Sequence, residues 1–563
     1  MGAARSRVFS VGFRPGRLLC WGPMRNESVT GERAKNFPAA LSPLIPLLLF
    51  LLLAAGGGMA LQAAGRPNLV FLMADDHRAF ALGSRGDPVI HTPRLDQLAR
   101  RGLSFTRCYA TSPICMASRA SVMTGLYEYR TGCNFGTGRL SAANWNRGYP
   151  LRLKRAGYRI AFAGKWGFPL EVPGYEKQFD RWGGFEGAGQ GFYETAKNPS
   201  LRAYAKKYPH VTLALGAFGR DFIAESVRQG RPFCLSLSFK APHKPHRYVV
   251  PRTATLYQHA RFTPMPNYGV AGLKRLPLQP KLGRQYAQRK EWLPEEQFQE
   301  HLRIYYRLIS GIDLAVGMVL DALRDNGVAG DTVVIYTSDN GYFCGAHGLQ
   351  GKVLPYDDSA RIPLIVYDPR RPENAGRVSS ALVGNIDFAP TLLDLAGVPI
   401  PEGLDGRSLR PIIEGRQTKG RDSLLLVQNW GWARNDQNRC LAVVTGRYKY
   451  IYWCYGDRNL EPVEELFDLR ADPWEMNNLA ARPEQAAVLR QMRALYDRHH
   501  AAWARHCVEL PAYREHTRIF DRHIPWRQKR FWTFDPAGTR KPDRALARIY
   551  RELVGAEPPP KTK

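Results

Sequence analysis

The chain of 563 residues carries 80 lysines and arginines against 50 aspartates and glutamates, a net charge of +30. With 44% hydrophobic and 11% aromatic residues it can bury a sizeable core, which excludes disordered and collagen-like proteins. Its length suits one large α/β domain with a smaller companion, or several ordinary domains. The nine cysteines are too sparse for a disulfide scaffold and lack the paired CxxC spacing of structural zinc sites.

The excess of positive charge has two interpretations. A diffuse basic surface keeps a protein soluble, whereas a concentrated one attracts nucleic acid, an anionic membrane, or a sulfated or phosphorylated substrate. The sequence contains no helix-turn-helix, RNP or zinc-finger pattern, so we expect no nucleic-acid partner. Composition therefore slightly favours an acidic small molecule or a glycan.

The N-terminal region resembles a secretory signal. An apolar block at residues 39–55 follows several basic residues and precedes a run of small ones. Pro43 and Pro46 weaken the alternative of a retained membrane anchor, because proline interrupts a spanning helix. We therefore expect an exported protein, periplasmic or secreted, cleaved within 58–65 and without a stable membrane partner.

From residue 66 onward, continuous apolar runs of strand length alternate with helical patterns. Such runs are typical of strands that are covered on both faces. One helix opens with Thr92 and Pro93, and a long amphipathic one stops at Gly327. The predicted strands are 68–74, 157–164, 232–240, 332–338 and 363–367, and the predicted helices are 92–102 and 300–326. This alternation predicts an α/β domain with a mostly parallel central sheet flanked by helices.

A passage rich in proline and glycine, residues 397–420, predicts a domain boundary. Beyond it, three short runs with a turn at Thr445 and Gly446 predict antiparallel strands at 423–427, 439–444 and 447–453, followed by a helix at 483–506. Cys440 and Cys454 flank this hairpin and are candidates for a bridge. The predicted organisation is a leader (1–64), a large catalytic domain (65–415), a smaller α+β domain with an antiparallel sheet (416–510) and a basic tail (511–563).

Polar side chains follow two of the predicted strands. Asp75 and Asp76 end the first strand, and Asp339 and Asn340 end the fourth. The carboxyl ends of parallel strands meet at one edge of a sheet, so these four residues supply oxygen ligands for one hard cation, Ca²⁺ or Mg²⁺. The alternative is that each pair only forms a turn.

The stretch around Cys115 is more specific. Cys115 opens a predicted helix, and Arg119 lies one turn along on the same face. One interpretation is a structural buried cysteine, and another is a thiolate nucleophile activated by the arginine and the helix terminus.

These residues resemble a known family. The string C-M-A-S-R-A-S-V-M-T-G is similar to the sulfatase signature C-x-P-S-R followed by T-G. Further blocks in the family's order extend the resemblance over nearly the whole chain: R-P-N-L-V-F-L-M-A-D-D, G-Y-R-I-A-F-A-G-K-W, A-P-H-K-P, T-S-D-N-G, G-A-H-G-L-Q-G-K and E-L-F-D-L-R-A-D-P-W-E-M-N-N-L-A. The chain is identified as similar to formylglycine-dependent type I sulfatases of the alkaline-phosphatase-like superfamily.

The resemblance implies a mechanism and a site. Cys115 would be converted to formylglycine by a formylglycine-generating enzyme, and one hydroxyl of the hydrated aldehyde would attack sulfur while the other expels sulfate. Arg119 would steady the hydrate, and His243 would protonate the departing alcohol. The divalent metal, usually Ca²⁺, would be held by Asp75, Asp76, Asp339 and Asn340. The groups that bind the sulfate oxygens or serve the leaving group would be Lys165, His243 and Lys352.

The sequence departs from the family pattern at two positions. Ala117 stands where proline is usual, which bears on recognition by the modifying enzyme. Gly167 stands where many members have a histidine that can take a proton from the second hydroxyl. We consider His77, directly after the metal-binding pair, as a replacement base, against the alternative of a surface residue at a strand end.

We therefore expect an exported sulfuric ester hydrolase that acts on a sulfated small molecule or glycan, with a sulfated carbohydrate as the favoured class. A phosphonate monoester or phosphodiester hydrolase would share the metal, the formylglycine and the fold, so motif residues do not separate the two. A catalytically inactive, glycan-binding relative is the alternative from another class. The intact metal-ligand positions and Cys115 weigh against it.

Overall fold

The computed structural model describes residues 65–136, 138–186, 190–431, 436–531 and 544–557. The predicted leader lies outside these residues. Within them, no helix has the length and apolar character needed to cross a membrane.

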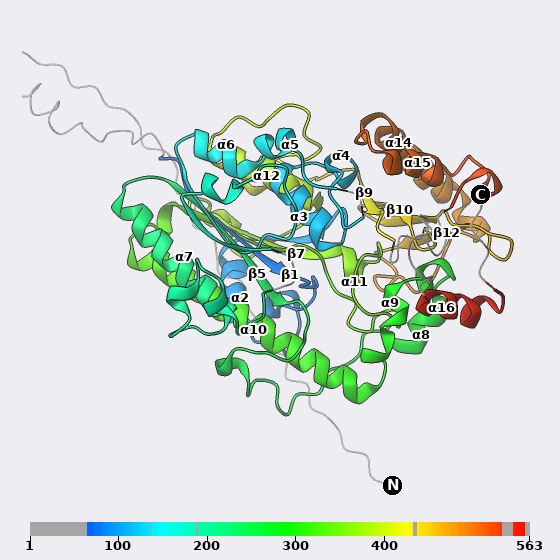
Figure 1. The fold of residues 1–563 in the computed structure, drawn as a ribbon, viewed down its shortest axis with the longest axis horizontal. Coiled ribbons are helices and arrows are strands. Elements are labelled where there is room, and N and C mark those ends of the chain that lie inside the picture. The colour runs from blue at the N-terminus through cyan, green and yellow to red at the C-terminus, as the bar shows by residue number, and fades with distance from the viewer. Residues whose placement is uncertain (1–64, 137, 187–189, 432–435, 532–543, 558–563) are drawn as a thin grey trace, which may run out of the picture. The chain divides into compact units, whose positions relative to one another are not determined.

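An eight-stranded sheet forms the centre of the larger part of the chain (Figure 1). Its strand order is β4-β3-β5-β1-β6-β7-β2-β8, and β7 alone among them runs antiparallel to its neighbours. The strands are β1 (Asn68–Asp75), β2 (Leu103–Tyr109), β3 (Arg159–Lys165), β4 (Arg181–Phe185), β5 (Phe233–Pro242), β6 (Thr332–Ser338), β7 (Arg361–Tyr367) and β8 (Arg377–Gly384). The predicted mostly parallel α/β sheet is confirmed.

Helices cover both faces of this sheet, as the alternating side chains of β1 require. Val70 and Leu72 pack into a core with one set of helices, whereas Leu69 and Phe71 pack into a second core on the other face. The first set is α2 (Pro93–Arg101), α7 (Val211–Arg228) and α10 (Glu295–Asp325), and the second includes α3 (Cys115–Thr124), α5 (Ala142–Arg147), α6 (Tyr149–Arg155) and α12 (Phe388–Leu395) (Figure 1). Both faces of the central strands are therefore buried, which explains why β1 is apolar along almost its whole length.

A separate antiparallel sheet follows, in the order β12-β11-β10-β9. Its strands are β9 (Ser423–Gln428), β10 (Cys440–Thr445), β11 (Tyr448–Trp453) and β12 (Val463–Asp468), and α14 (Ala486–His506) packs on it. The predicted hairpin and helix are confirmed. Cys440 and Cys454 are both buried free thiols, so the candidate bridge is not formed.

Within its described residues, the basic segment after residue 510 contains two amphipathic helices. They are α15 (Pro511–Phe520) and α16 (Arg544–Val554), and both bury aromatic residues in the core around the second sheet. Besides several 3-10 turns, five short α-helices complete the α-helices of the described residues: α4 (Glu128–Thr131), α8 (Gly269–Arg275), α9 (Arg284–Ala287), α11 (Asp357–Ala360) and α13 (Arg410–Ile413).

Candidate functional site

The sheet order explains how distant residues meet. β3, β5, β1 and β6 are adjacent and parallel, so their carboxyl ends share one edge. Lys165 ends β3, His243 directly follows β5, Asp75 ends β1 and Asp339 directly follows β6. The order and parallel direction of these strands thus bring residues from four separate stretches of the sequence to one edge of the sheet.

Three carboxylates lie together at this edge. One oxygen from each of Asp75, Asp76 and Asp339 falls within 4.8 Å of the others. The Asp76 backbone N–H donates to Asp339 Oδ1 at 3.1 Å, and Asn340 Nδ2 donates to Asp76 Oδ1 at 2.6 Å. Asp76 has a φ of +74°, a left-handed conformation that is uncommon for aspartate and that turns its side chain into the cluster.

The donor set of this cluster fits a hard divalent cation. Every available ligand atom is an oxygen, which Ca²⁺ and Mg²⁺ prefer. Asp76 Oδ2 and Asn340 Oδ1 are buried and have no hydrogen-bond partner among the described residues. Burial raises the pKa of Asp76, and burial together with the Asp75 charge raises the pKa of Asp339 to about 6. A bound cation would satisfy both oxygens and favour ionised carboxylates.

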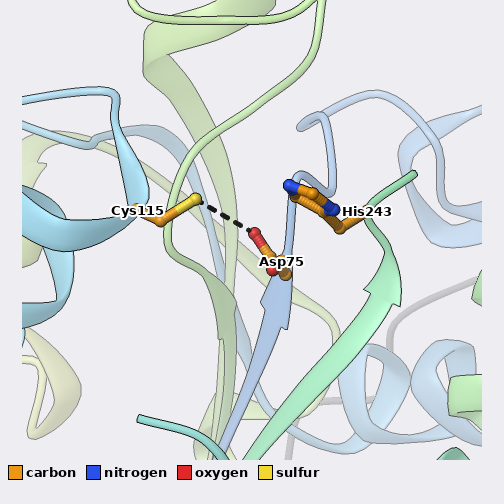
Figure 2. A group of neighbouring side chains, drawn as sticks. All are labelled: Asp75, Cys115 and His243. Carbon is orange, nitrogen blue, oxygen red and sulfur yellow. Dashed lines mark hydrogen bonds between the residues drawn. The ribbon is translucent and has the colours of Figure 1, made fainter. Parts of the chain in front are cut away.

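Cys115 is the first residue of α3 and is buried beside the acidic cluster (Figure 2). Its Sγ lies 3.4 Å from Asp75 Oδ1 and 2.6 Å from Lys352 Nζ. Burial and the Asp75 charge raise the pKa of the Cys115 thiol to about 11, although both nearby lysines oppose this. This pKa opposes the interpretation of Cys115 as a simple thiolate nucleophile, which needs a lowered pKa.

Arg119 lies one turn further along α3 and is fully buried. Its Nε donates to Asp339 Oδ2 at 2.9 Å, and its Nη1 donates to the Lys165 carbonyl at 2.8 Å. Arg119 therefore ties α3, and with it Cys115, to the ends of β6 and β3.

Two lysines complete the charge balance. Lys165 Nζ lies 2.5 Å from Asp75 Oδ2, and Lys352 Nζ contacts Asp76 Oδ1. Burial opposes the ionisation of Asp75, but these cations outweigh it and hold the pKa of Asp75 well below its usual range. Both ammonium groups are thereby kept within reach of Cys115.

His243 presents one ring nitrogen to the cluster. Its Nδ1 is 2.7 Å from the Lys244 carbonyl, which fixes a proton on that nitrogen, and its Nε2 lies 3.9 Å from Asp76 Oδ2. Burial, with repulsion from Lys165 and Lys352, lowers the pKa of His243 to about 3. His243 is therefore neutral in this structure, with Nε2 able to accept a proton. Figure 2 shows it converging with Cys115 and Asp75 from a different strand end.

A cavity of 810 Å³ opens over these residues. Cys115, Lys165, His243 and Lys352 contribute to its wall. Its other lining residues include Lys244, which lies in the A-P-H-K-P stretch, and several from loops and a short helix that no sequence motif indicates: Phe135, Glu186, Arg284, Gln288 and Trp430. No local periodicity marks such positions, because only the tertiary fold brings them together.

The structure excludes His77 as the replacement base. Its two ring nitrogens are engaged by the Tyr336 hydroxyl at 2.7 Å and the Ala81 carbonyl at 2.8 Å. It is fully buried and does not line the cavity. Gly167 does line the cavity, but its φ is +88° and a Cβ there would lie 2.7 Å from Arg119 Cδ. A histidine at 167 would therefore have to displace Arg119.

Comparison with known proteins agrees with this geometry. A sequence model of the sulfatase family matches residues 67–398, and a model of the N-sulphoglucosamine sulphohydrolase C-terminal region matches 345–501. N-acetylglucosamine-6-O-sulfatase of Bacteroides thetaiotaomicron is 29% identical over 528 residues, which cover 82% of this chain and 91% of that protein.

Solved structures give the same fold. A protein solved in complex with its substrate D-glucosamine-2-N,6-O-disulfate is 25% identical with a TM-score of 0.64, covering 82% of this chain and 100% of that one. A phosphonate monoester hydrolase of Agrobacterium radiobacter shares the fold with a TM-score of 0.61 at 22% identity, covering 78% of this chain and 96% of that one. The site geometry and the family match over most of the large domain lead to one conclusion: the chain belongs to the sulfatase family and is a sulfuric ester hydrolase.

Proposed function

We propose that this protein is exported and hydrolyses a sulfate ester of a sulfated carbohydrate, with Cys115 matured to formylglycine and one bound Ca²⁺. The observation that carries this proposal is the position of Cys115. Its Sγ lies between Asp75 of the acidic cluster and the Lys352 ammonium group, at the wall of a cavity large enough for a saccharide.

The oxygen ligands for the cation would be Asp75, Asp76, Asp339 and Asn340. When bound, the cation supplies positive charge that polarises the sulfuryl group. A matured Cys115 supplies a hydrated aldehyde, with one hydroxyl as nucleophile and the other to release sulfate.

The side chains of this chain would perform the remaining tasks. Lys165 and Lys352 present ammonium groups beside residue 115, where they would neutralise the sulfate oxygens as charge develops on them. Arg119, held by Asp339 and the Lys165 carbonyl, would fix the orientation of residue 115.

His243 would handle the leaving-group proton. The free imidazole is neutral, and the negative charge of a bound sulfate ester would raise its pKa. Nε2, the nitrogen that faces the cluster, would then donate to the departing alcohol oxygen. The Nδ1 contact with the Lys244 carbonyl holds the ring in the required orientation.

A carbohydrate substrate is supported by two aromatic side chains of the cavity. Phe135 is 54% exposed, which is unusual for a large apolar side chain, and its ring centroid lies 6.2 Å from that of Trp430. Trp430 also packs against the small cluster of Ile114, Ala117 and Val353, of which Ile114 directly precedes Cys115 in the chain. Exposed aromatic faces beside a reactive group suit the apolar face of a sugar ring. The similar N-acetylglucosamine-6-O-sulfatase supports the same class.

The test begins with maturation. Protein secreted from cells that contain a formylglycine-generating enzyme should show, by peptide mass spectrometry, an aldehyde and its hydrate at residue 115. Its N-terminus should fall within 58–65. Maturation is the step to test first, because Ala117 replaces the proline that is usual in the modified motif. Recovery of only unmodified Cys115 in protein that still hydrolyses sulfate esters would refute the mechanism.

The same protein should hydrolyse 4-nitrophenyl sulfate and sulfated saccharides faster than a phosphonate monoester. Cys115→Ser should abolish turnover, because serine cannot form the hydrated aldehyde, while its melting curve stays close to that of the unchanged protein. Cys507→Ser, at a buried free thiol beyond the end of α14 and outside the cavity, is the matched control and should keep full activity. A faster phosphonate reaction would favour the phosphonate monoester hydrolase instead.

A further inference from the structure

Two positively charged side chains of the cavity wall, Lys244 and Arg284, have no part in the proposed chemistry. Its charged lining includes Lys165, Lys244, Arg284 and Lys352 against Asp76 and Glu186. Lys165 and Lys352 pair with carboxylates of the acidic cluster. Within the described part of the chain, neither Lys244 nor Arg284 forms an ion pair with a carboxylate. Arg284 Nε donates instead to the neutral Gln288 side chain at 3.2 Å.

These two cations lie close enough to repel each other. Both are half-buried in the cavity wall. Burial lowers the pKa of Lys244; the charges of Glu291 and Asp76 partly offset this effect, and repulsion from Arg284 and Lys352 adds to it. Two unpaired cations held together in a partly dry wall attract an anion strongly.

The position of Arg284 relative to the reacting centre is fixed by α9. Gln285 Nε2 donates to the Lys352 carbonyl at 2.6 Å, and the Gln350 N–H donates to the Gln285 carbonyl at 3.1 Å. On its other side, the Tyr286 hydroxyl donates to Glu552 of α16 at 2.8 Å. The helix that carries Arg284 is therefore tied directly to the segment that carries Lys352.

We propose that Lys244 and Arg284 form a subsite for a second acidic group of the substrate, a sulfate or a carboxylate, so that the enzyme selects saccharides that carry two anionic groups. This inference rests on the proposed function. The planar guanidinium of Arg284 can bind either group through two parallel hydrogen bonds, and Lys244 adds a point charge. The subsite would bind an acidic group on the sugar that departs, rather than the sulfate that is cleaved, because it lies outside the cluster that surrounds Cys115.

Steady-state kinetics with four sulfate esters tests the subsite. The substrates are 4-nitrophenyl sulfate, D-glucosamine 6-O-sulfate, D-glucosamine-2-N,6-O-disulfate, and a disaccharide that joins a uronic acid to glucosamine 6-O-sulfate. The unchanged enzyme should prefer the disulfated sugar or the uronate disaccharide, and which of the two it prefers identifies the second group.

Arg284→Gln should raise KM for the preferred doubly charged substrate about 10- to 100-fold, as expected for a lost charged hydrogen bond, with kcat nearly unchanged. The two singly charged esters should change by no more than about 2-fold, since they do not reach the subsite. Arg284→Lys should recover part of the loss. Arg275→Gln, which removes an exposed charge from α8 outside the cavity, should leave the preference intact.

Equal effects of Arg284→Gln on all four esters, or no preference for a second charge, would overturn the subsite while leaving the proposed function standing. Failure of the matured enzyme to hydrolyse any sulfate ester would overturn the proposed function, and the subsite with it. If only 4-nitrophenyl sulfate is hydrolysed, inhibition of that reaction by the three sugars gives the same comparison. Equal inhibition by singly and doubly charged sugars then counts against the subsite.

Discussion

Asp75 and Asp76 are neighbours in the chain but meet opposite electrostatic conditions. Cations hold the pKa of Asp75 well below its usual range despite its burial, whereas burial raises the pKa of Asp76. The left-handed backbone at Asp76 lets both adjacent side chains enter one cluster, although strand residues normally point to opposite faces. This strain is concentrated where the cation would bind.

Gly167 provides a prediction at the same scale. Gly167→Ala should lower kcat/KM about 10- to 100-fold, because its Cβ would push Arg119 and misplace residue 115. Gly157→Ala is a matched control, since Gly157 has a similar φ of +91° but a Cβ added there would meet no other atom within 4 Å. Each alanine should cost about 1–2 kcal/mol of stability for its left-handed backbone.

The measurement pairs melting curves with 4-nitrophenyl sulfate kinetics for both variants. Loss of activity in Gly157→Ala as large as in Gly167→Ala would mean that backbone strain, rather than contact with Arg119, is responsible. Gly167→His should be at least as inactive as Gly167→Ala, although many sulfatases have a histidine at this position, because a larger side chain would displace Arg119 further.

The residues of the site divide into those that the sequence can predict and those that it cannot. Asp75 and Asp339 follow apolar strands, and Cys115 lies in a distinctive motif, so strand ends and resemblance are sufficient to find them. Phe135 and Trp430 lie in loops almost 300 residues apart, and no pattern links them. Their pairing depends on how the chain after β9 packs beside α3.

At the scale of elements, the buried strands are the easiest to predict. β1 and β6 are mainly apolar along their length, and every residue of β5 is buried although it contains Ser236 and Ser238, because helices cover both faces of the sheet. β4 escapes prediction because it is short and contains Gly183 and Gly184, and β8 because its first half is polar and partly exposed. α16 is clearly amphipathic, with Leu546, Ile549 and Tyr550 buried, so the sequence contained a pattern for this helix that the prediction of a basic tail missed.

The short helix α4 lies close in the chain to Phe135, one of the two aromatic residues of the cavity, and gives the next prediction. Glu128 of α4 accepts hydrogen bonds from Asn134, the residue before Phe135, and from the Tyr513 hydroxyl. Burial raises the pKa of Glu128 from 4.5 to about 7. Between about pH 4.5 and about pH 7, Glu128 is therefore protonated in the folded state and ionised in the unfolded state. The free energy of unfolding consequently falls as the pH rises through this range.

Glu128→Gln keeps the accepting oxygen and removes the titration. Between pH 5 and pH 8, its free energy of unfolding should therefore rise by about 1–3 kcal/mol relative to that of the unchanged protein. Its melting temperature relative to the unchanged protein should rise over the same range. Glu464→Gln should show no such change between pH 5 and pH 8, because Arg493 and Tyr450 lower the pKa of Glu464 below its unfolded value of 4.5, so its contribution to stability is lost only at more acidic pH. Parallel pH trends for the two variants would contradict the assignment of a raised pKa to Glu128.

At the scale of the whole molecule, the acidic cluster joins the two faces of the large sheet. Arg119 of α3 lies in the layer on one face, and Tyr305 of α10, on the other face, donates to the Asp76 carbonyl at 2.5 Å. Arg119, Lys165 and Lys352 already pair with the three buried carboxylates at this junction, but Asp76 Oδ2 and Asn340 Oδ1 have no hydrogen-bond partner among the described residues. A cation bound there would satisfy these two oxygens and would therefore stabilise the fold as well as serve the reaction.

Removal of the cation should accordingly lower the melting temperature, and this measurement does not depend on activity. Adding Ca²⁺ at about 100 times its Kd to chelator-treated protein should stabilise the fold by about 2.7 kcal/mol through mass action. Asp339→Asn should abolish this stabilisation. Asp313→Asn should retain it, because Asp313 is a buried aspartate of α10 whose carboxylate instead accepts the backbone N–H groups of Arg94 and Leu95. A melting temperature that is indifferent to chelator and Ca²⁺, or a Ca²⁺ shift that persists in Asp339→Asn, would show that these carboxylates do not hold the cation.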